Sequence, residues 1–160
     1  MEDDGTSHSV RSFTTVQFYS ERSYNTLSVP YTSVRSSDGD NDGKNDLYKF
    51  EFRVPNVDSE NVREVFAAVV FNYTLNSRIN SEMKSMAAFS ASTPKGASGV
   101  RAFGELVLRQ KNPLYDDTYI KNEYDESPLA AMMNSSATDL IYTYNQRNET
   151  TFFEHDYVIM

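Results

Sequence analysis

The sequence predicts an all-β fold, an antiparallel β-sandwich of about seven short strands with room for one short helix. Three observations favour this class. Aromatic residues make up 13% of the chain, with 11 Tyr, 10 Phe and no Trp, and such residues are enriched in strands. Apolar and polar residues alternate with a period of two in several segments. Turn-forming residues separate those segments.

The segment Leu47–Val54 is the clearest strand in the sequence. Charged residues alternate with apolar ones along it, and this pattern is typical of an antiparallel strand with one buried face. We expect that face to lie in the core; it consists of Tyr48, Phe50, Phe52 and Val54. The pattern predicts further strands at residues 12–19, 27–31, 64–75, 100–110, 140–144 and 150–153, whereas residues 76–92 fit either a helix or a strand.

A chain of 160 residues is long enough for one domain with a hydrophobic core. No internal repeat divides it. We therefore expect residues 1–12 to form a flexible leader, residues 13–153 a single β-sandwich domain and residues 154–160 a tail. The longest apolar run, Val65–Phe71, has the length of a strand, and no stretch approaches the roughly 20 apolar residues that span a bilayer.

The composition excludes several classes of function. A net charge of −8 and a pI near 4.7 disfavour nucleic acid and anionic lipid as partners, because both require a basic surface. The chain has no Cys, which excludes a disulfide scaffold and a thiol nucleophile. Neither His8 nor His155 lies in a pattern typical of a catalytic triad. We expect no catalytic residues and a protein that is not an enzyme.

The sharpest local motif runs from residue 38 to residue 46 with the sequence DGDNDGKND, directly before the strand at Leu47. Carboxylates at alternate positions converge when the backbone curls, and Gly43 permits the positive φ that such a curl requires. Oxygen ligands of this kind suit Ca²⁺. The candidate ligands are the carboxylates of Asp38, Asp40, Asp42 and Asp46 and the carbonyl of Lys44. The alternative is a solvated Asp/Asn/Gly turn.

The sequence also contains three Asn-x-Ser/Thr sequons, at Asn72, Asn134 and Asn148. Glycosylation at these positions would place the chain on the secretory side of a membrane. Because Asn, Ser and Thr are frequent in this sequence, sequons are also expected by chance. The three residues are therefore candidate glycosylation sites.

Several segments, in the same order, resemble the ectodomain of the transmembrane protein 231 family. They are Leu27–Pro30, the acidic loop with the strand that follows it, Ser85–Phe89, Gly104–Pro113 and Tyr144–Thr151. The resemblance covers about residues 25–151. It implies a domain on the extracellular side of the membrane of the ciliary transition zone, flanked in the family by two membrane helices that are absent from this chain.

The resemblance also implies a structural and interaction role. Its expected partners are other transition-zone membrane proteins, in a Meckel/tectonic-like complex that forms a diffusion barrier and supports ciliogenesis and hedgehog signalling. Of the family's motifs, the loop positions Asp38, Asp40, Asp42, Lys44 and Asp46 and the sequon at Asn148 carry over to this sequence. We expect Ca²⁺ in the loop to be structural.

Two other functions remain open from the sequence. The first is a calcium-dependent binding or adhesion module, which would place the cation beside an exposed aromatic groove. The second is a hydrolase on the same fold, which would require two carboxylates about 5–9.5 Å apart in a cleft.

Overall fold

The computed structural model describes residues 13, 29–58, 61–76, 80–113, 121–130 and 137–160. The chain divides into two compact units, residues 1–57 and residues 58–160. Seven strands and one short helix make up the regular structure of the described residues, which confirms the all-β class. Among the described residues these strands pair in three separate sheets of two, three and two strands.

The expected domain boundaries differ from those in the structure. The single domain expected over residues 13–153 is divided after Val57, shortly beyond a turn in which Asn56 has a φ of 56°. Residues 154–159, expected as part of a tail, lie in the last strand and pair with residues 100–105. Glu154 and Asp156 make the first part of this stretch polar, so the second half of the strand resembles a tail in the sequence.

The first unit contains a hairpin. Strands β1 (Tyr31–Ser37) and β2 (Leu47–Arg53) pair antiparallel, and the amide of Asp46 donates a hydrogen bond of 2.9 Å to the carbonyl of Ser37 at the start of the loop. The predicted strand at Leu47 is confirmed, but the face expected in the core is 41–56% exposed. In this unit the two described strands form a single layer, so they supply no second layer to cover Tyr48, Phe50, Phe52 and Val54.

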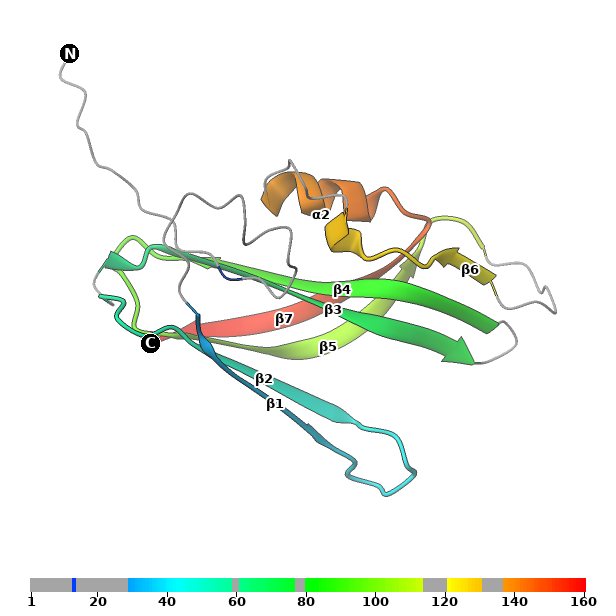
Figure 1. Cartoon of the computed structure of the whole chain (residues 1–160), viewed down its shortest axis with the longest axis horizontal. Helices are drawn as coiled ribbons and strands as arrows, with labels where there is room; N and C mark the ends of the chain where they lie inside the picture. The colour runs from blue at the N-terminus through cyan, green and yellow to red at the C-terminus, as the bar shows by residue number, and fades with distance from the viewer. Residues whose placement is uncertain (1–12, 14–28, 59–60, 77–79, 114–120, 131–136) are drawn as a thin grey trace, which may run out of the picture. The chain divides into compact units, whose positions relative to one another are not determined.

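The second unit is built on two long antiparallel strand pairs (Figure 1). Strands β3 (Glu64–Asn76) and β4 (Asn80–Ser92) pair antiparallel along their whole length, and β6 (Lys121–Tyr124) pairs parallel with the beginning of β4. Strands β5 (Val100–Gln110) and β7 (Glu149–Ile159) pair antiparallel in a second sheet. The ambiguous segment 76–92 is therefore largely strand.

Strand β4 lies against β7 and forms the centre of the core. The ring of Phe89 meets the rings of His155 and Tyr157 edge to face, with centroids 5.2 and 6.0 Å apart. Toward the other end of β4, Met83 and Ser85 are buried on the same face. When two sheets pack face to face, burial of these alternate side chains is the main contribution to stability.

The helix α2 (Ala137–Asn145) replaces the strand that was expected at residues 140–144. In a strand, Leu140, Tyr142 and Tyr144 would share one face. In the structure Leu140 and Tyr144 are 1% and 4% exposed, whereas Tyr142 is 67% exposed. Burial at positions i and i+4 is the spacing of a helix face. No helix in the described part of the chain is long and apolar enough to cross a bilayer.

Gly104 allows β5 and β7 to approach closely. Its partner in the register is His155, and a Cβ atom built on Gly104 would lie 1.9 Å from the carbonyl oxygen of Glu154 and 2.7 Å from Cα of His155. Both neighbours are backbone atoms, so no side-chain rotation relieves the clash. The stacked rings of Phe153 and His155, with centroids 4.9 Å apart, flank this point of β7.

Candidate functional site: an acidic loop and a polar corner

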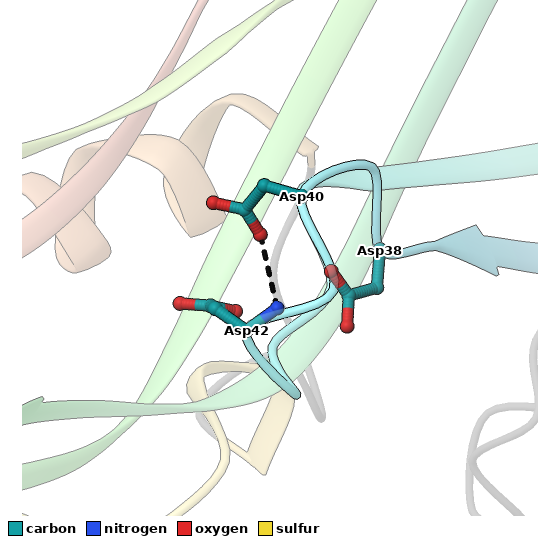
Figure 2. Close-up of side chains that lie close together, drawn as sticks. All are labelled: Asp38, Asp40 and Asp42. Atoms are coloured by element: carbon teal, nitrogen blue, oxygen red, sulfur yellow. Dashed lines mark hydrogen bonds between the residues drawn. The ribbon is translucent and has the colours of Figure 1, made fainter.

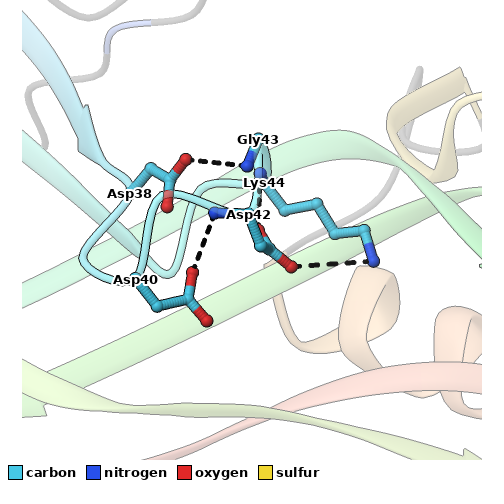
Figure 3. Close-up of polar contacts among 5 residues, drawn as sticks. All are labelled: Asp38, Asp40, Asp42, Gly43 and Lys44. Carbon is cyan, nitrogen blue, oxygen red and sulfur yellow. Dashed lines mark hydrogen bonds and ion pairs between the residues drawn. The ribbon is translucent and has the colours of Figure 1, made fainter.

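The acidic loop between β1 and β2 is held by hydrogen bonds that its own backbone amides donate to its carboxylates (Figure 3). Asp38 accepts a bond of 2.9 Å from the amide of Gly43, and Asp42 accepts one of 2.8 Å from the amide of Lys44. Gly43 has a φ of 87°, as the motif predicts, and Asn41 has a φ of 59°. Asn tolerates the left-handed region better than most residues, which allows the second reversal.

Three carboxylates converge in this loop (Figure 2). One oxygen from each of Asp38, Asp40 and Asp42 lies within 4.8 Å of the others. Oδ1 of Asp38 is buried and has no hydrogen-bond partner among the described residues. Like charges at this spacing repel one another, and a divalent cation between them would relieve the repulsion. The arrangement is chemically suited to a hard cation with oxygen ligands.

The loop also contains the other two predicted ligands, Asp46 and Lys44. The carboxylate of Asp46 accepts a hydrogen bond of 2.7 Å from the amide of Gly39 and is not among the three converging carboxylates. The ammonium group of Lys44 lies 3.9 Å from Oδ2 of Asp42, at the surface. Asp46 therefore helps to close the loop.

The sequons lie in different surroundings. Asn72 is exposed on β3, where its side chain accepts a hydrogen bond of 2.6 Å from Lys84 on β4. Asn148 is half-buried, and its side chain accepts a bond of 2.8 Å from the amide of Asn112. Asn134 lies outside the described residues.

A second cluster lies where α2 turns into β7, and we call it the polar corner; it consists of Tyr144, Arg147, Asn148, Glu149 and Thr151. The hydroxyl of Tyr144 accepts hydrogen bonds from the amides of Met86 (3.1 Å) and Thr151 (2.9 Å). It also lies 3.0 Å from Oγ1 of Thr151, which in turn donates to the carbonyl of Met86 at 2.9 Å.

These distances fix the direction of each bond. Because the proton of the Thr151 hydroxyl is directed at Met86, the proton of the Tyr144 hydroxyl is directed at Thr151. The phenol oxygen thus accepts two bonds and donates one, which is its full capacity. Tyr144 and Thr151 together satisfy both backbone groups of Met86 on the side of β4 that faces away from β3.

Arg147 contacts the same edge of β4. Its guanidinium donates to the carbonyl of Lys84 at 2.8 Å and to that of Glu126 at 3.3 Å. It lies 4.9 and 5.3 Å from the ring centroids of Tyr124 and Tyr144. Burial lowers the pKa of Arg147, while the two tyrosines act in the opposite direction. The two carbonyls and the two ring faces interact with the guanidinium in place of the water that burial removes.

Asn148 and Glu149 connect the corner to the remaining strands. The backbone of Asn148 donates to the hydroxyl of Tyr124 (2.8 Å) and accepts from the amide of Lys111 (2.9 Å). The buried carboxylate of Glu149 accepts a bond of 3.2 Å from the hydroxyl of Ser81 at the start of β4. The corner therefore joins β4, β5, β6, α2 and β7 through polar contacts.

The polar corner was missed in the sequence, where this segment carries a sequon between two expected strands. Its signal is the density of hydrogen-bonding side chains in Tyr144–Thr151, a stretch that no catalytic pattern explains. In the structure these side chains satisfy backbone groups. His155, the one described histidine, contacts aromatic rings and bonds to a backbone carbonyl.

The fold and these two clusters define a class of protein: an all-β domain in which polar side chains bond to backbone groups, with an acidic loop suited to a cation. The chain belongs to the transmembrane protein 231 family, whose model, described as Transmembrane protein 231, matches residues 1–160. The name of the family identifies its members as membrane proteins.

Curated relatives support this assignment. The chain is 33% identical over 130 residues to Transmembrane protein 231 of Xenopus tropicalis and 34% identical over 130 residues to that of Homo sapiens. It is 32% identical over 133 residues to the protein of Rattus norvegicus. Each of these matches covers 78% of this chain and 40–41% of the relative, so the chain spans well under half of their length. No solved structure matches the chain.

Proposed function

We propose that this chain is a structural and interaction domain of a membrane protein at the ciliary transition zone. In this proposal it faces the extracellular side and contacts other transition-zone membrane proteins in a Meckel/tectonic-like complex. The complex would restrict diffusion between the ciliary and plasma membranes, and it would support ciliogenesis and hedgehog signalling. The proposal is carried by membership of the transmembrane protein 231 family along the whole chain.

The structure supports a non-enzymatic role within this proposal. In the second unit, the hydrogen bonds of the polar corner connect five elements. A rigid domain of this kind presents a constant surface to partners, which lowers the entropic cost of binding.

The proposal is tested by a domain exchange in ciliated cells that lack their own transmembrane protein 231. A full-length relative carries residues 1–160 of this chain in place of its matching segment, and its position is recorded by fluorescence microscopy. We expect retention at the transition zone. A chimaera that reaches the plasma membrane but is not retained at the base of the cilium would contradict the proposal.

We also propose that Ca²⁺ binds the acidic loop and has a structural role. The support is the convergence of Asp38, Asp40 and Asp42 together with the buried, unpartnered Oδ1 of Asp38 among the described residues. Asp46 and the carbonyl of Lys44 would complete the ligand set. A calcium-dependent extracellular binding or adhesion module is the second candidate function, and the same cluster favours it.

Calcium should bind the loop and stabilise the hairpin. At 100 times the dissociation constant, a ligand stabilises a folded unit by about 2.7 kcal/mol. The measurement is titration calorimetry of the chain with Ca²⁺, with Mg²⁺ for comparison, and thermal unfolding in EDTA and in Ca²⁺. Asp42→Asn should abolish the binding, because it removes one converging charge. Lys44→Ala is the matched control, since it keeps the carbonyl and should bind at least as well. Equal heats for wild type and Asp42→Asn would refute the site.

The exposed sequon at Asn72 supports a third proposal, which is glycosylation of the chain on the secretory side of a membrane. Asn72 is exposed on β3, whereas Asn148 is half-buried. We propose Asn72 as a glycosylation site of the chain and keep Asn134 and Asn148 as candidates from the sequence alone.

A further inference from the structure

In the part of the chain that the structure describes, one edge of the three-stranded sheet in the second unit has no neighbouring strand. Within the described residues β3 pairs only with β4, and β3 lies at the margin of its sheet (Figure 1). The far edge of β4 is closed instead, by β6 at one end and by the polar corner at Lys84 and Met86. Among the described residues, one edge of this sheet is therefore covered by other elements and the other edge is not.

The contacts of Met86 show which residues of β3 present their backbone at the open edge. The amide and carbonyl of Met86 point away from β3, toward Tyr144 and Thr151. Val70 is opposite Met86 in the register. In an antiparallel pair of this type both residues direct their backbone groups outward, so the N–H and C=O of Val70 point away from β4. Every second residue does the same, including Ala68, Asn72 and Thr74.

This edge lacks the features that keep strands apart. Natural edge strands are protected by Lys, Pro, bulges or short length. The sequence of β3 contains no Lys, Arg or Pro, and its register with β4 is continuous over 13 pairs. From Val65 to Phe71 the side chains are apolar and half-buried. An unprotected strand of this length is a template for addition of another strand.

We propose that β3 pairs antiparallel with β3 of a second copy of this chain, around a two-fold axis at Val70. The midpoint of Glu64–Asn76 is residue 70, and its backbone groups point outward, so this register pairs the whole strand. It places Val69 opposite Phe71 and Val65 opposite Leu75. Glu64, the one charged residue of β3, faces Asn76, so no like charges are opposed. An isologous contact of this kind closes as a dimer and joins two three-stranded sheets.

The register is tested by cysteine cross-linking, which is clean because the chain has no Cys. In the proposed dimer the two copies of residue 70 form a hydrogen-bonded pair with Cα atoms about 5.5 Å apart, within the range of a disulfide. Val70→Cys should therefore give a covalent dimer under mild oxidation. In Thr74→Cys the two thiols are eight residues apart along the pair, about 26 Å, and no such dimer should form. Equal cross-linking of both variants would refute the register.

The pairing itself is tested by sedimentation equilibrium of the glycan-free chain. The wild type should reach twice its mass of 18.2 kDa with increasing concentration. Asn72→Pro removes an outward-facing N–H without removing a bond to β4, and it should remain monomeric with an unchanged circular dichroism spectrum. Asn72→Ala is matched to it, since it also removes the sequon but keeps the N–H, and it should dimerise. A wild type that stays monomeric, or a dimer that survives Asn72→Pro, would overturn the proposal and leave the transition-zone role untouched.

Discussion

Replacing Tyr144 with phenylalanine should destabilise the second unit by about 2–4 kcal/mol, because it removes one hydroxyl that is shared by three hydrogen bonds. The amides of Met86 and Thr151 would both lose their acceptor in a buried place, and each unsatisfied group costs about 1–3 kcal/mol. The volume of the ring is unchanged, so the effect reports on the hydroxyl alone.

The measurement is urea unfolding followed by circular dichroism. Tyr142→Phe is the matched control, because the residue lies on the same helix, two positions away, and is 67% exposed. Its effect should stay within about 0.5 kcal/mol. Equal midpoints for the two variants would mean that the polar corner does not hold the edge of β4.

Replacing Gly104 with alanine should have an effect of similar size, about 3 kcal/mol or more, for a steric reason. The added methyl group would lie 1.9 Å from the carbonyl oxygen of Glu154, and only a shift of the β5 or β7 backbone can relieve that overlap. The same shift would disturb the aromatic layer of Phe89, Phe153 and His155 on the inner face.

Gly99→Ala is the control for this prediction. A Cβ atom at Gly99 would meet only the end of the Met160 side chain, at 3.3 Å, which can move aside. The two variants are compared by thermal unfolding of the full chain, and the melting temperature should fall much further for Gly104→Ala. Equal melting temperatures would show that β5 and β7 do not approach as closely at this point.

The strands with clear alternation were predictable from the sequence. The predicted segment 100–110 coincides with β5, and the predictions for β2 and β3 differ from the structure by one residue at the C-terminal end. Period-two alternation follows directly from strand geometry, so it needs no knowledge of the neighbours. The curl at Gly43 was predictable for the same local reason, since few other residues accept its φ of 87°.

The features that the sequence did not predict depend on tertiary contacts. The pattern of Leu140, Tyr142 and Tyr144 fits a strand and a helix, and the burial of Leu140 and Tyr144 decides for the helix. The apolar face of β2 indicates a preference for burial, but it does not say whether a second layer is present. The polar corner depends on contacts between residues about 60 positions apart, such as Met86 and Tyr144, which local patterns do not contain.

The acidic loop was predictable in part. The alternate carboxylates and Gly43 indicated a convergence, and Asp38, Asp40 and Asp42 do converge. The left-handed φ of Asn41 and the bond from Gly39 to Asp46 were not indicated by the spacing. Both depend on how the loop closes on the hairpin, where the amide of Asp46 reaches the carbonyl of Ser37.

We propose that this domain is a structural part of a diffusion barrier in the ciliary membrane. The most direct test uses the cells with the exchanged domain and measures how fast a plasma-membrane reporter enters a photobleached cilium. We expect slow entry with the wild-type chimaera and faster entry with its Gly104→Ala variant, compared at equal amounts of protein at the cell surface. Entry as slow as in wild type for a full-length relative that lacks the whole segment would contradict the account.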